Sequence, residues 1–285
     1  MEIPLLVSTD WLAAHLNAPN VRIVDVRWYL FEKDKNGRDE YLRGHIPGAV
    51  FLDIDGDLAA PFGQGPGRHP LPSLKVFTEA ASRAGIGADT HVIAYDDRGG
   101  ATAARLWWLL RYCGHDQVSL LDGGVVRWTT EARAVQTEVP NPPRAMFVAH
   151  PRPEMRVDFK TVDALRKEPR ACVLDVRLPE RYEGKVEPID PKAGHVPGAK
   201  NAPIGGNLRA LDDSRFLDPA ELRARYDALG AGKAERVVAY CGSGVNACQA
   251  IFAMQLAVID SLLYEGSWSD WSRTPGAPVA VGAEE

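Results

Sequence analysis

The sequence has few cysteines, no excess of positive charge and no long apolar run, and each shortage excludes a class of protein. Four cysteines among 285 residues are too few for a disulfide framework. A net charge of −5 provides no extended basic surface, so neither nucleic acid nor a membrane surface is expected as a partner. No segment is apolar over the length that a membrane-spanning helix requires. The first ten residues lack a basic region followed by an apolar stretch, so we expect no signal peptide.

The composition that is present is ordinary for a globular protein, with 45% hydrophobic and 25% charged residues. A chain of 285 residues is long for one domain and suits two. With so few cysteines, we expect reduced thiols and a cytoplasmic location. Any site for an anion must then be local, because the overall charge is negative.

An internal repeat organises the chain. Val24-Asp25-Val26-Arg27 recurs as Leu174-Asp175-Val176-Arg177, and the block 44–49 recurs as 194–199 at the same offset of 150 residues. Two further blocks, 92–96 and 121–124, recur in order at 237–241 and 264–267. Four blocks in one order indicate two homologous domains. We place them at 1–140 and 154–285, joined by a proline-rich, extended linker at 141–153.

Each half alternates short β-branched runs with longer helical patterns. The expected strands are Val21–Val26, His91–Tyr95, Gln117–Leu121, Ala171–Val176 and Val237–Tyr240. The expected helices are Ser73–Ala84, Ala101–Cys113, Pro219–Leu229 and Asn246–Leu256. This alternation predicts the α/β class, with a parallel sheet in each domain and helices on both of its faces. Ligands of such sheets bind at the carboxyl ends of the strands.

Cys241 stands at such an end, between an expected strand and an expected helix. The loop that it opens reads Cys241-Gly242-Ser243-Gly244-Val245-Asn246. Backbone N–H groups of a tight loop and the positive end of the following helix dipole both favour a thiolate over a thiol. The position therefore predicts a nucleophilic sulfur.

Two motifs give the chain a resemblance to a known family. The first is Tyr41 followed by His45-Ile46-Pro47-Gly48-Ala49 and Leu52. The second is Tyr264-Glu265-Gly266-Ser267-Trp268-Ser269-Asp270-Trp271, with Asp270 where glutamate is usual. Both are similar to signatures of the tandem-domain rhodanese sulfurtransferases that use thiosulfate or 3-mercaptopyruvate. In this family the N-terminal domain lacks the cysteine, and here Asp96 stands at the position that matches Cys241.

The resemblance implies that the Cys241 thiolate takes a sulfur atom from a small anionic donor and carries it as a persulfide. The acceptor would be cyanide, a small thiol or a thioredoxin-like protein thiol, with no cofactor or metal. Gly242, Gly244, Val245 and Asn246 would line the site, and Asn246 replaces the threonine common in the family. Typical thiosulfate enzymes carry basic residues at the second and third loop positions, so Gly242 and Ser243 favour mercaptopyruvate.

The resemblance also implies partners outside the loop. Ser243 would act with His69 and Asp55 on the leaving enolate of pyruvate. Arg181 matches the family's first arginine for the substrate carboxylate, which calls for a bidentate cation. The second arginine is missing, and Lys185 or Lys192 is expected to supply that charge.

Other interpretations remain open. The alternative main activity for this chain is thiosulfate:cyanide sulfur transfer, and a non-catalytic sulfur-binding module is the non-enzymatic alternative. A cysteine-dependent phosphatase needs an arginine six residues after the cysteine, where this chain has Ala247. We expect a monomer or a weak dimer.

Several repeated residues have structural explanations. Asp25 and Asp175 are expected to form buried pairs with Arg27 and Arg177. His45 and His195 occur in both halves although only one half has the cysteine, so we expect them to fix turns. Core packing is predicted for the tryptophans, namely Trp107, Trp108, Trp128, Trp268 and Trp271.

Overall fold

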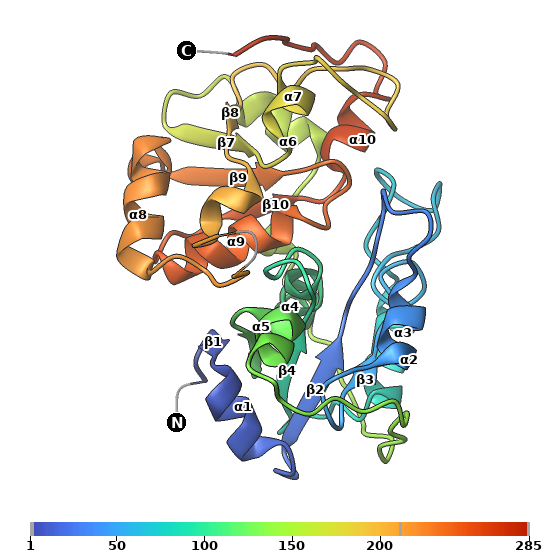
Figure 1. The fold of residues 1–285 in the computed structure, drawn as a ribbon. Coiled ribbons are helices and arrows are strands. Elements are labelled where there is room, and N and C mark those ends of the chain that lie inside the picture. Colours follow the sequence, from blue (N-terminus) through green and yellow to red (C-terminus); the bar gives the residue numbers. More distant parts are fainter. Residues whose placement is uncertain (1–2, 211–212, 284–285) are drawn as a thin grey trace. The chain divides into compact units, whose positions relative to one another are not determined.

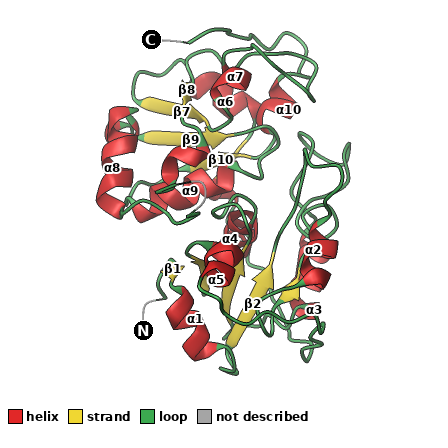
Figure 2. Cartoon of the chain, in the orientation of Figure 1, coloured by secondary structure: helices red, strands yellow, loops and turns green. Residues whose placement is uncertain are grey.

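The structure is a computed structural model that describes residues 3–210 and 213–283. These residues form two compact units (Figures 1 and 2). The first comprises residues 3–60, 72–152, 208–210 and 213–216, and the second comprises 61–71, 153–207 and 217–283. Within the described ranges, no helix combines the length and the apolar character needed to cross a bilayer.

Each unit is built on a sheet of five parallel strands. The strand order is β1-β5-β4-β2-β3 in the first unit and β6-β10-β9-β7-β8 in the second. Replacing each strand of the first order by the strand five places later gives the second order. This equivalence and the parallel pairing confirm the predicted fold class of two tandem α/β domains.

The elements of the first unit are short. Its strands are β1 (Leu6–Val7), β2 (Val21–Asp25), β3 (Val50–Phe51), β4 (His91–Tyr95) and β5 (Val118–Leu121). Its helices are α1 (Thr9–His15), α2 (Gly37–Arg43), α3 (Leu74–Arg83), α4 (Ala103–Tyr112) and α5 (Gly124–Thr130).

The second unit repeats this scheme. Its strands are β6 (Arg156–Val157), β7 (Ala171–Asp175), β8 (Lys200–Asn201), β9 (Arg236–Tyr240) and β10 (Leu262–Tyr264). Its helices are α6 (Phe159–Leu165), α7 (Pro179–Tyr182), α8 (Pro219–Ala228), α9 (Ala247–Leu256) and α10 (Ser267–Trp271). Three short 3₁₀ turns lie at Pro153–Met155, Ile204–Asn207 and Ala231–Lys233.

All strands and helices that the alternation predicted are present, and their ends shift by at most two residues. The sequence pattern did not predict β1, β3, β6, β8 and β10, nor the helices α1, α2, α5, α6, α7 and α10. Of these strands, β10 has three residues and the others have two, which is too short for a periodic pattern. Each of these helices has seven residues or fewer.

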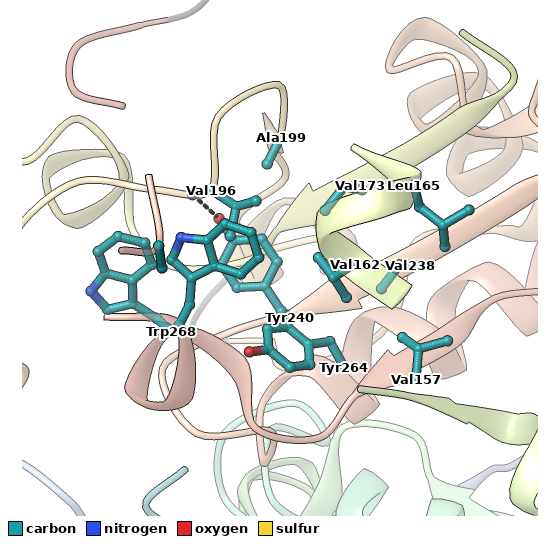
Figure 3. Close-up of a cluster of buried hydrophobic side chains, with 12 residues drawn as sticks. Val157, Val162, Leu165, Val173, Val196, Ala199, Val238, Tyr240, Tyr264 and Trp268 are labelled. Atoms are coloured by element: carbon teal, nitrogen blue, oxygen red, sulfur yellow. Dashed lines mark hydrogen bonds between the residues drawn. The ribbon is translucent and has the colours of Figure 1, made fainter. Parts of the chain in front are cut away.

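The sheet of the second unit is covered on both faces. Figure 3 shows one face, where Val173, Val238 and Tyr240 pack with Trp268 and with residues of α6. The Tyr240 hydroxyl accepts a hydrogen bond of 3.0 Å from the Val196 N–H. Helices α8 and α9 lie on the opposite side of the sheet (Figures 1 and 2). Each large apolar side chain that is fully buried contributes about 1.5–3 kcal/mol, which makes the sheet a rigid base for the loops at its edge.

The proline-rich segment after residue 139 has neither helix nor strand up to residue 152, as its prolines predict. It packs along the first unit instead of spanning open solvent. Phe147 is buried there and meets the ring of Phe77 edge to face, while the Ala145 N–H donates to the Ser82 carbonyl. The segment therefore forms part of the compact first unit.

Residues 61–71 precede α3 in the chain but belong to the second unit. The Arg68 N–H donates to Ser269 Oγ over 2.9 Å, and Gly67 approaches the Gly266 carbonyl so closely that a Cβ would lie 2.3 Å from its oxygen. The left-handed backbone of Gly67, with a φ of 73°, also requires glycine. This segment brings the residues on either side of Gly67 to α10.

The repeated aspartate–arginine pairs are buried, as predicted, and the structure shows that they are bidentate. The Arg27 guanidinium donates to both oxygens of Asp25 and to the Gly44 carbonyl. The Arg177 guanidinium makes the matching bonds to Asp175 and Gly194. Each pair ties the end of a central strand to the turn that holds the repeated histidine.

The repeated histidines are structural, which confirms that prediction. His45 and His195 are fully buried, and each ring stacks on a tyrosine at a centroid distance of 3.9 Å (Tyr41) or 3.7 Å (Tyr182). Nδ1 of each histidine lies 2.8 Å from the carbonyl oxygen of the same tyrosine. The predicted core tryptophans are also buried, each with at most 2% of its surface exposed.

In the first unit, Asp96 directly follows β4, at the position that matches Cys241 in the second unit. Its carboxylate accepts hydrogen bonds of 2.7–2.9 Å from the N–H groups of Arg98, Gly100, Thr102 and Ala103. The loop and the first residues of α4 thus wrap a negative group with backbone donors. In this unit the chain itself supplies the anion.

We predict that Asp96→Ala destabilises the protein by about 3 kcal/mol, because it leaves several buried N–H donors without an acceptor. Urea unfolding measures this loss. Asp89→Ala removes an exposed carboxylate of the same unit and should change the free energy of unfolding by less than about 0.5 kcal/mol. Equal effects of both substitutions would contradict this account of Asp96.

Candidate active site

Cys241 directly follows β9, which lies between β10 and β7 in the sheet of the second unit. Helix α9 begins six residues later, at Ala247. The cysteine therefore lies at the carboxyl edge of a parallel sheet and close to the positive end of a helix, where such folds bind anions.

The backbone of the loop points a donor at the sulfur. Gly244 adopts a left-handed conformation with a φ of 84°, and its N–H donates to Cys241 Sγ over 3.1 Å. A Cβ on Gly244 would lie 2.5 Å from the Glu265 carbonyl oxygen, so only glycine fits. An N–H donor at this distance stabilises negative charge on the sulfur.

The start of α10 holds the loop in place. The Ser267 hydroxyl accepts a hydrogen bond of 3.1 Å from the Cys241 N–H. The N–H groups of Trp268 and Ser269 donate to the carbonyls of Cys241 and Gly242 over 3.0 and 2.9 Å. The motif at residues 264–271 thus fixes the cysteine loop through these three hydrogen bonds.

The other cysteines have surroundings that suppress reactivity. Burial raises the pKa of the Cys113 thiol to about 12, and burial likewise raises the pKa of Cys172. Both groups stay protonated at neutral pH, and a thiol is a poor nucleophile. Cys248 is fully buried in α9, where its thiol lies 3.4 Å from the Gly244 carbonyl oxygen.

Ser243 and His69 come together although 174 residues separate them in the chain. Ser243 Oγ lies 2.7 Å from His69 Nδ1, and both side chains are buried. Segment 61–71 supplies the histidine and the cysteine loop supplies the serine, so both belong to the second unit. A hydroxyl bonded to an imidazole can donate or accept a proton.

Asp55 lies in the first unit. Its Oδ2 accepts a hydrogen bond of 2.8 Å from the Trp28 indole N–H. Its backbone N–H donates to Asp53 Oδ1 over 3.2 Å. The role of Asp55 alongside Ser243 and His69 stays a prediction.

Arg181 lies in α7, with only 9% of its surface exposed. Its Nη2 donates to Glu187 Oε1 over 2.7 Å and lies 3.7 Å from Asp190 Oδ2. Its Nη1 lies 3.4 Å from the position that a Cβ on Gly242 would occupy. The predicted substrate arginine is therefore beside the loop.

Arg68 is a cation at the loop that the sequence did not suggest, in addition to the two lysines that it did. Lys185 is exposed and pairs with Glu183, and the Lys192 side chain is exposed. Arg68 Nη2, in contrast, lies 3.3 Å from the Cβ position of Gly242. Arg68 was not predicted as a site residue, although it directly precedes His69 in the sequence.

The remaining loop residues have mainly structural surroundings. Val245 is 1% exposed. Asn246 is half-buried at the start of α9, and its side chain makes no capping hydrogen bond. If Val245 and Asn246 contact the substrate as predicted, we expect the contact to come from their backbone N–H groups.

Iodoacetamide should modify Cys241 faster than Cys113 or Cys172 at neutral pH, because burial raises the pKa of Cys113 and of Cys172, whereas the Gly244 N–H donates to Cys241 Sγ. Mass spectrometry of peptides from the folded protein measures the order. After denaturation in urea, all four cysteines should react at similar rates, which is the control. Equal labelling of Cys113 and Cys241 in the folded protein would contradict the assignment.

Comparison with known proteins gives a consistent family. Residues 8–131 and 158–274 each match the rhodanese-like domain. A Pseudomonas aeruginosa protein named "Probable 3-mercaptopyruvate sulfurtransferase" is 42% identical over 281 residues, which cover 97% of this chain and 98% of that protein. The Arabidopsis thaliana thiosulfate/3-mercaptopyruvate sulfurtransferase 1 is 32% identical over 96% of this chain and 77% of its own length.

A solved structure agrees with these matches. The crystal structure of the Escherichia coli 3-mercaptopyruvate sulfurtransferase superposes with a TM-score of 0.82 at 34% identity, covering 93% of this chain and 99% of that one. The fold and the sequence thus point to the same relatives over nearly the whole length. The chain belongs to the rhodanese-like family, among its two-domain sulfurtransferases.

Proposed function

We propose that this sulfurtransferase takes sulfur from 3-mercaptopyruvate onto Cys241 and passes it to a thiol acceptor. The observation that carries the proposal is the geometry of the Cys241 loop. The Gly244 N–H donates to Cys241 Sγ, and Ser243, two residues after the cysteine, is hydrogen-bonded to His69. Relatives over nearly the full length that are named for this donor support it.

In the first step, the Cys241 thiolate attacks the thiol sulfur of the donor. A sulfur–sulfur bond forms, the bond between that sulfur and C3 breaks, and its electron pair stays on C3 as the enolate of pyruvate. The new persulfide ionises, and the proton that it releases balances the proton that converts the enolate to pyruvate.

Ser243 and His69 are proposed to handle this proton. The 2.7 Å bond lets the imidazole polarise the hydroxyl, which donates toward the enolate oxygen as the charge develops. Asp55 is proposed to orient the imidazole, in the manner of the third group of a catalytic triad.

The loop is proposed to hold the persulfide by its backbone. In the first unit, the Asp96 carboxylate takes the N–H groups of Arg98, Gly100 and Thr102. With the repeat offset of 145 residues, the corresponding amides are those of Ser243, Val245 and Ala247. Asp96 is the position that matches Cys241. The outer sulfur of a Cys241 persulfide would therefore place its negative charge at the point that corresponds to the carboxylate oxygens of Asp96.

In the second step, a thiolate or cyanide attacks the outer sulfur. The sulfur–sulfur bond breaks, its electron pair returns to Cys241 Sγ, and the product is a new persulfide or thiocyanate. A small thiol or a thioredoxin-like protein is the proposed acceptor. A cycle that runs through a free thiol suits a reducing compartment, so we propose a cytoplasmic location.

Thiosulfate is the second candidate donor. The guanidinium groups of Arg68 and Arg181 beside Gly242 provide positive charge that the loop itself lacks. They could hold either a sulfonate-like dianion or a carboxylate. The phosphatase interpretation lacks support, because Ala247 stands where that chemistry needs an arginine.

Incubation with 3-mercaptopyruvate should add 32 Da to the peptide that contains Cys241, the mass of one sulfur atom. Intact-protein and peptide mass spectrometry measure the adduct. Cys241→Ser should carry no adduct, whereas Cys113→Ser should behave as the unchanged protein. A protein that takes no sulfur from either donor would support a non-catalytic sulfur-binding module instead.

Ser243→Ala should lower kcat/KM about 100-fold with 3-mercaptopyruvate and much less with thiosulfate. The reason is that pyruvate leaves as an enolate that needs a proton, whereas sulfite leaves as a stable anion. Steady-state kinetics with both donors measures the difference, and Ser261→Ala, outside the loop, is the matched control. Equal losses with both donors would count against the role of Ser243.

A further inference from the structure

Three arginines of the second unit converge on one buried carboxylate. Asp190 has no exposed side-chain surface. Its Oδ1 accepts hydrogen bonds from Arg68 Nη1 over 2.8 Å and from Arg273 Nη1 over 2.7 Å. Arg181 Nη2 lies 3.7 Å from Oδ2. Asp190 thereby fixes the guanidinium groups that approach the cysteine loop.

Two of these groups turn toward the loop. Arg68 Nη2 and Arg181 Nη1 flank the Cβ position of Gly242 at 3.3 and 3.4 Å. They are therefore at most about 7 Å apart, and a carboxylate that accepts a bond of about 2.9 Å from each can bridge them. Within residues 3–210 and 213–283, the Nε atoms of both arginines are buried and have no hydrogen-bond partner. Donor capacity therefore remains on both side chains.

The surrounding charge favours an anion. Arg177 and Arg181 pair with Glu187, and Arg177 also pairs with Asp175. Together with Asp190, the cluster contains four guanidinium groups and three carboxylates. One positive charge is left over, and it lies in a mostly buried setting where Coulomb interactions are stronger than in water.

We propose that Arg68 is the second guanidinium that, together with Arg181, binds the carboxylate of the sulfur donor. The inference rests on the proposed function of the Cys241 loop. It gives Arg68 the task for which the sequence offered only Lys185 or Lys192. A planar guanidinium binds a carboxylate in two places, which a lysine ammonium cannot do.

The position of Arg68 beside His69 fits the chemistry of an α-keto acid. In such a donor, the carboxylate and the keto oxygen are on adjacent carbon atoms. Adjacent residues of segment 61–71 then meet adjacent groups of the substrate, with Arg68 at the carboxylate and the pair of His69 and Ser243 at the keto oxygen. The bond from the Arg68 N–H to Ser269 Oγ holds this segment at α10.

The experiment compares alkylation of Cys241 by iodoacetate, which carries a carboxylate, and by the neutral iodoacetamide. Arg68→Gln and Arg181→Gln should each lower the ratio of the two rates about 10-fold, because a positive charge beside Gly242, the residue after Cys241, is lost. Arg68→Lys should retain most of the ratio. The KM for 3-mercaptopyruvate should rise about 10-fold in Arg68→Gln.

Arg273→Gln is the matched control, because Arg273 binds the same Asp190 oxygen, whereas the three atoms nearest to the Cβ position of Gly242 belong to Arg68 and Arg181. It should lower the ratio far less than Arg68→Gln does, because Asp190 and the Ser269 carbonyl hold the Arg273 guanidinium. An unchanged ratio in Arg68→Gln, or an equal fall in Arg273→Gln, would overturn the proposal and leave Arg68 a structural partner of Asp190. The ratio does not depend on sulfur transfer, so absence of the 32 Da adduct in the unchanged protein would refute the proposed function separately.

Discussion

The position of the Cys241 sulfur depends on the left-handed backbone of Gly244. This conformation turns the Gly244 N–H back toward Sγ and lets the loop pass within contact of the Glu265 carbonyl. A side chain at this position would move the loop away from Glu265 and from the start of α10. Since Ser267, Trp268 and Ser269 bind the same loop, the rest of the site is built around this one turn.

The two units show two uses of the same backbone arrangement. In the first, the Asp96 carboxylate occupies the N–H groups of its own loop, and this anion is covalently fixed. In the second, the chain places a cysteine at the matching position, where the proposed mechanism moves a negative charge from Sγ to an outer sulfur and back. In the first unit the backbone N–H groups of this loop stabilise the fold by binding Asp96. In the second unit we propose that the matching N–H groups bind the reacting sulfur.

A chain with a net charge of −5 can still bind anions, because its positive charge is concentrated locally. The buried Asp190 carboxylate allows three guanidinium groups to approach one another, which mutual repulsion would otherwise oppose. The same carboxylate restricts where these groups can point. Positive charge beside the loop thus comes from Arg68 and Arg181, which are distant from the loop in the sequence. The loop residues Gly242 and Ser243 themselves have small side chains.

The sequence by itself determined the features that depend on local patterns. Period and composition identified the longer strands and helices, and the repeat identified two α/β domains. The position of Cys241 after a strand identified the sulfur that we propose to be reactive. The pairs Asp25–Arg27 and Asp175–Arg177 were predictable because two residues separate the partners. Strands of two residues carry no period and were missed.

Only the tertiary structure decided which distant side chains share the site. Segment 61–71 belongs to the second unit because Gly67 and Arg68 bind α10, about 200 residues later, and no local pattern encodes that contact. The same contact explains why Arg68 lies beside Gly242. The sequence gives the chemical type of each side chain. Which side chains lie close to one another depends on the packing of segments that are far apart in the chain.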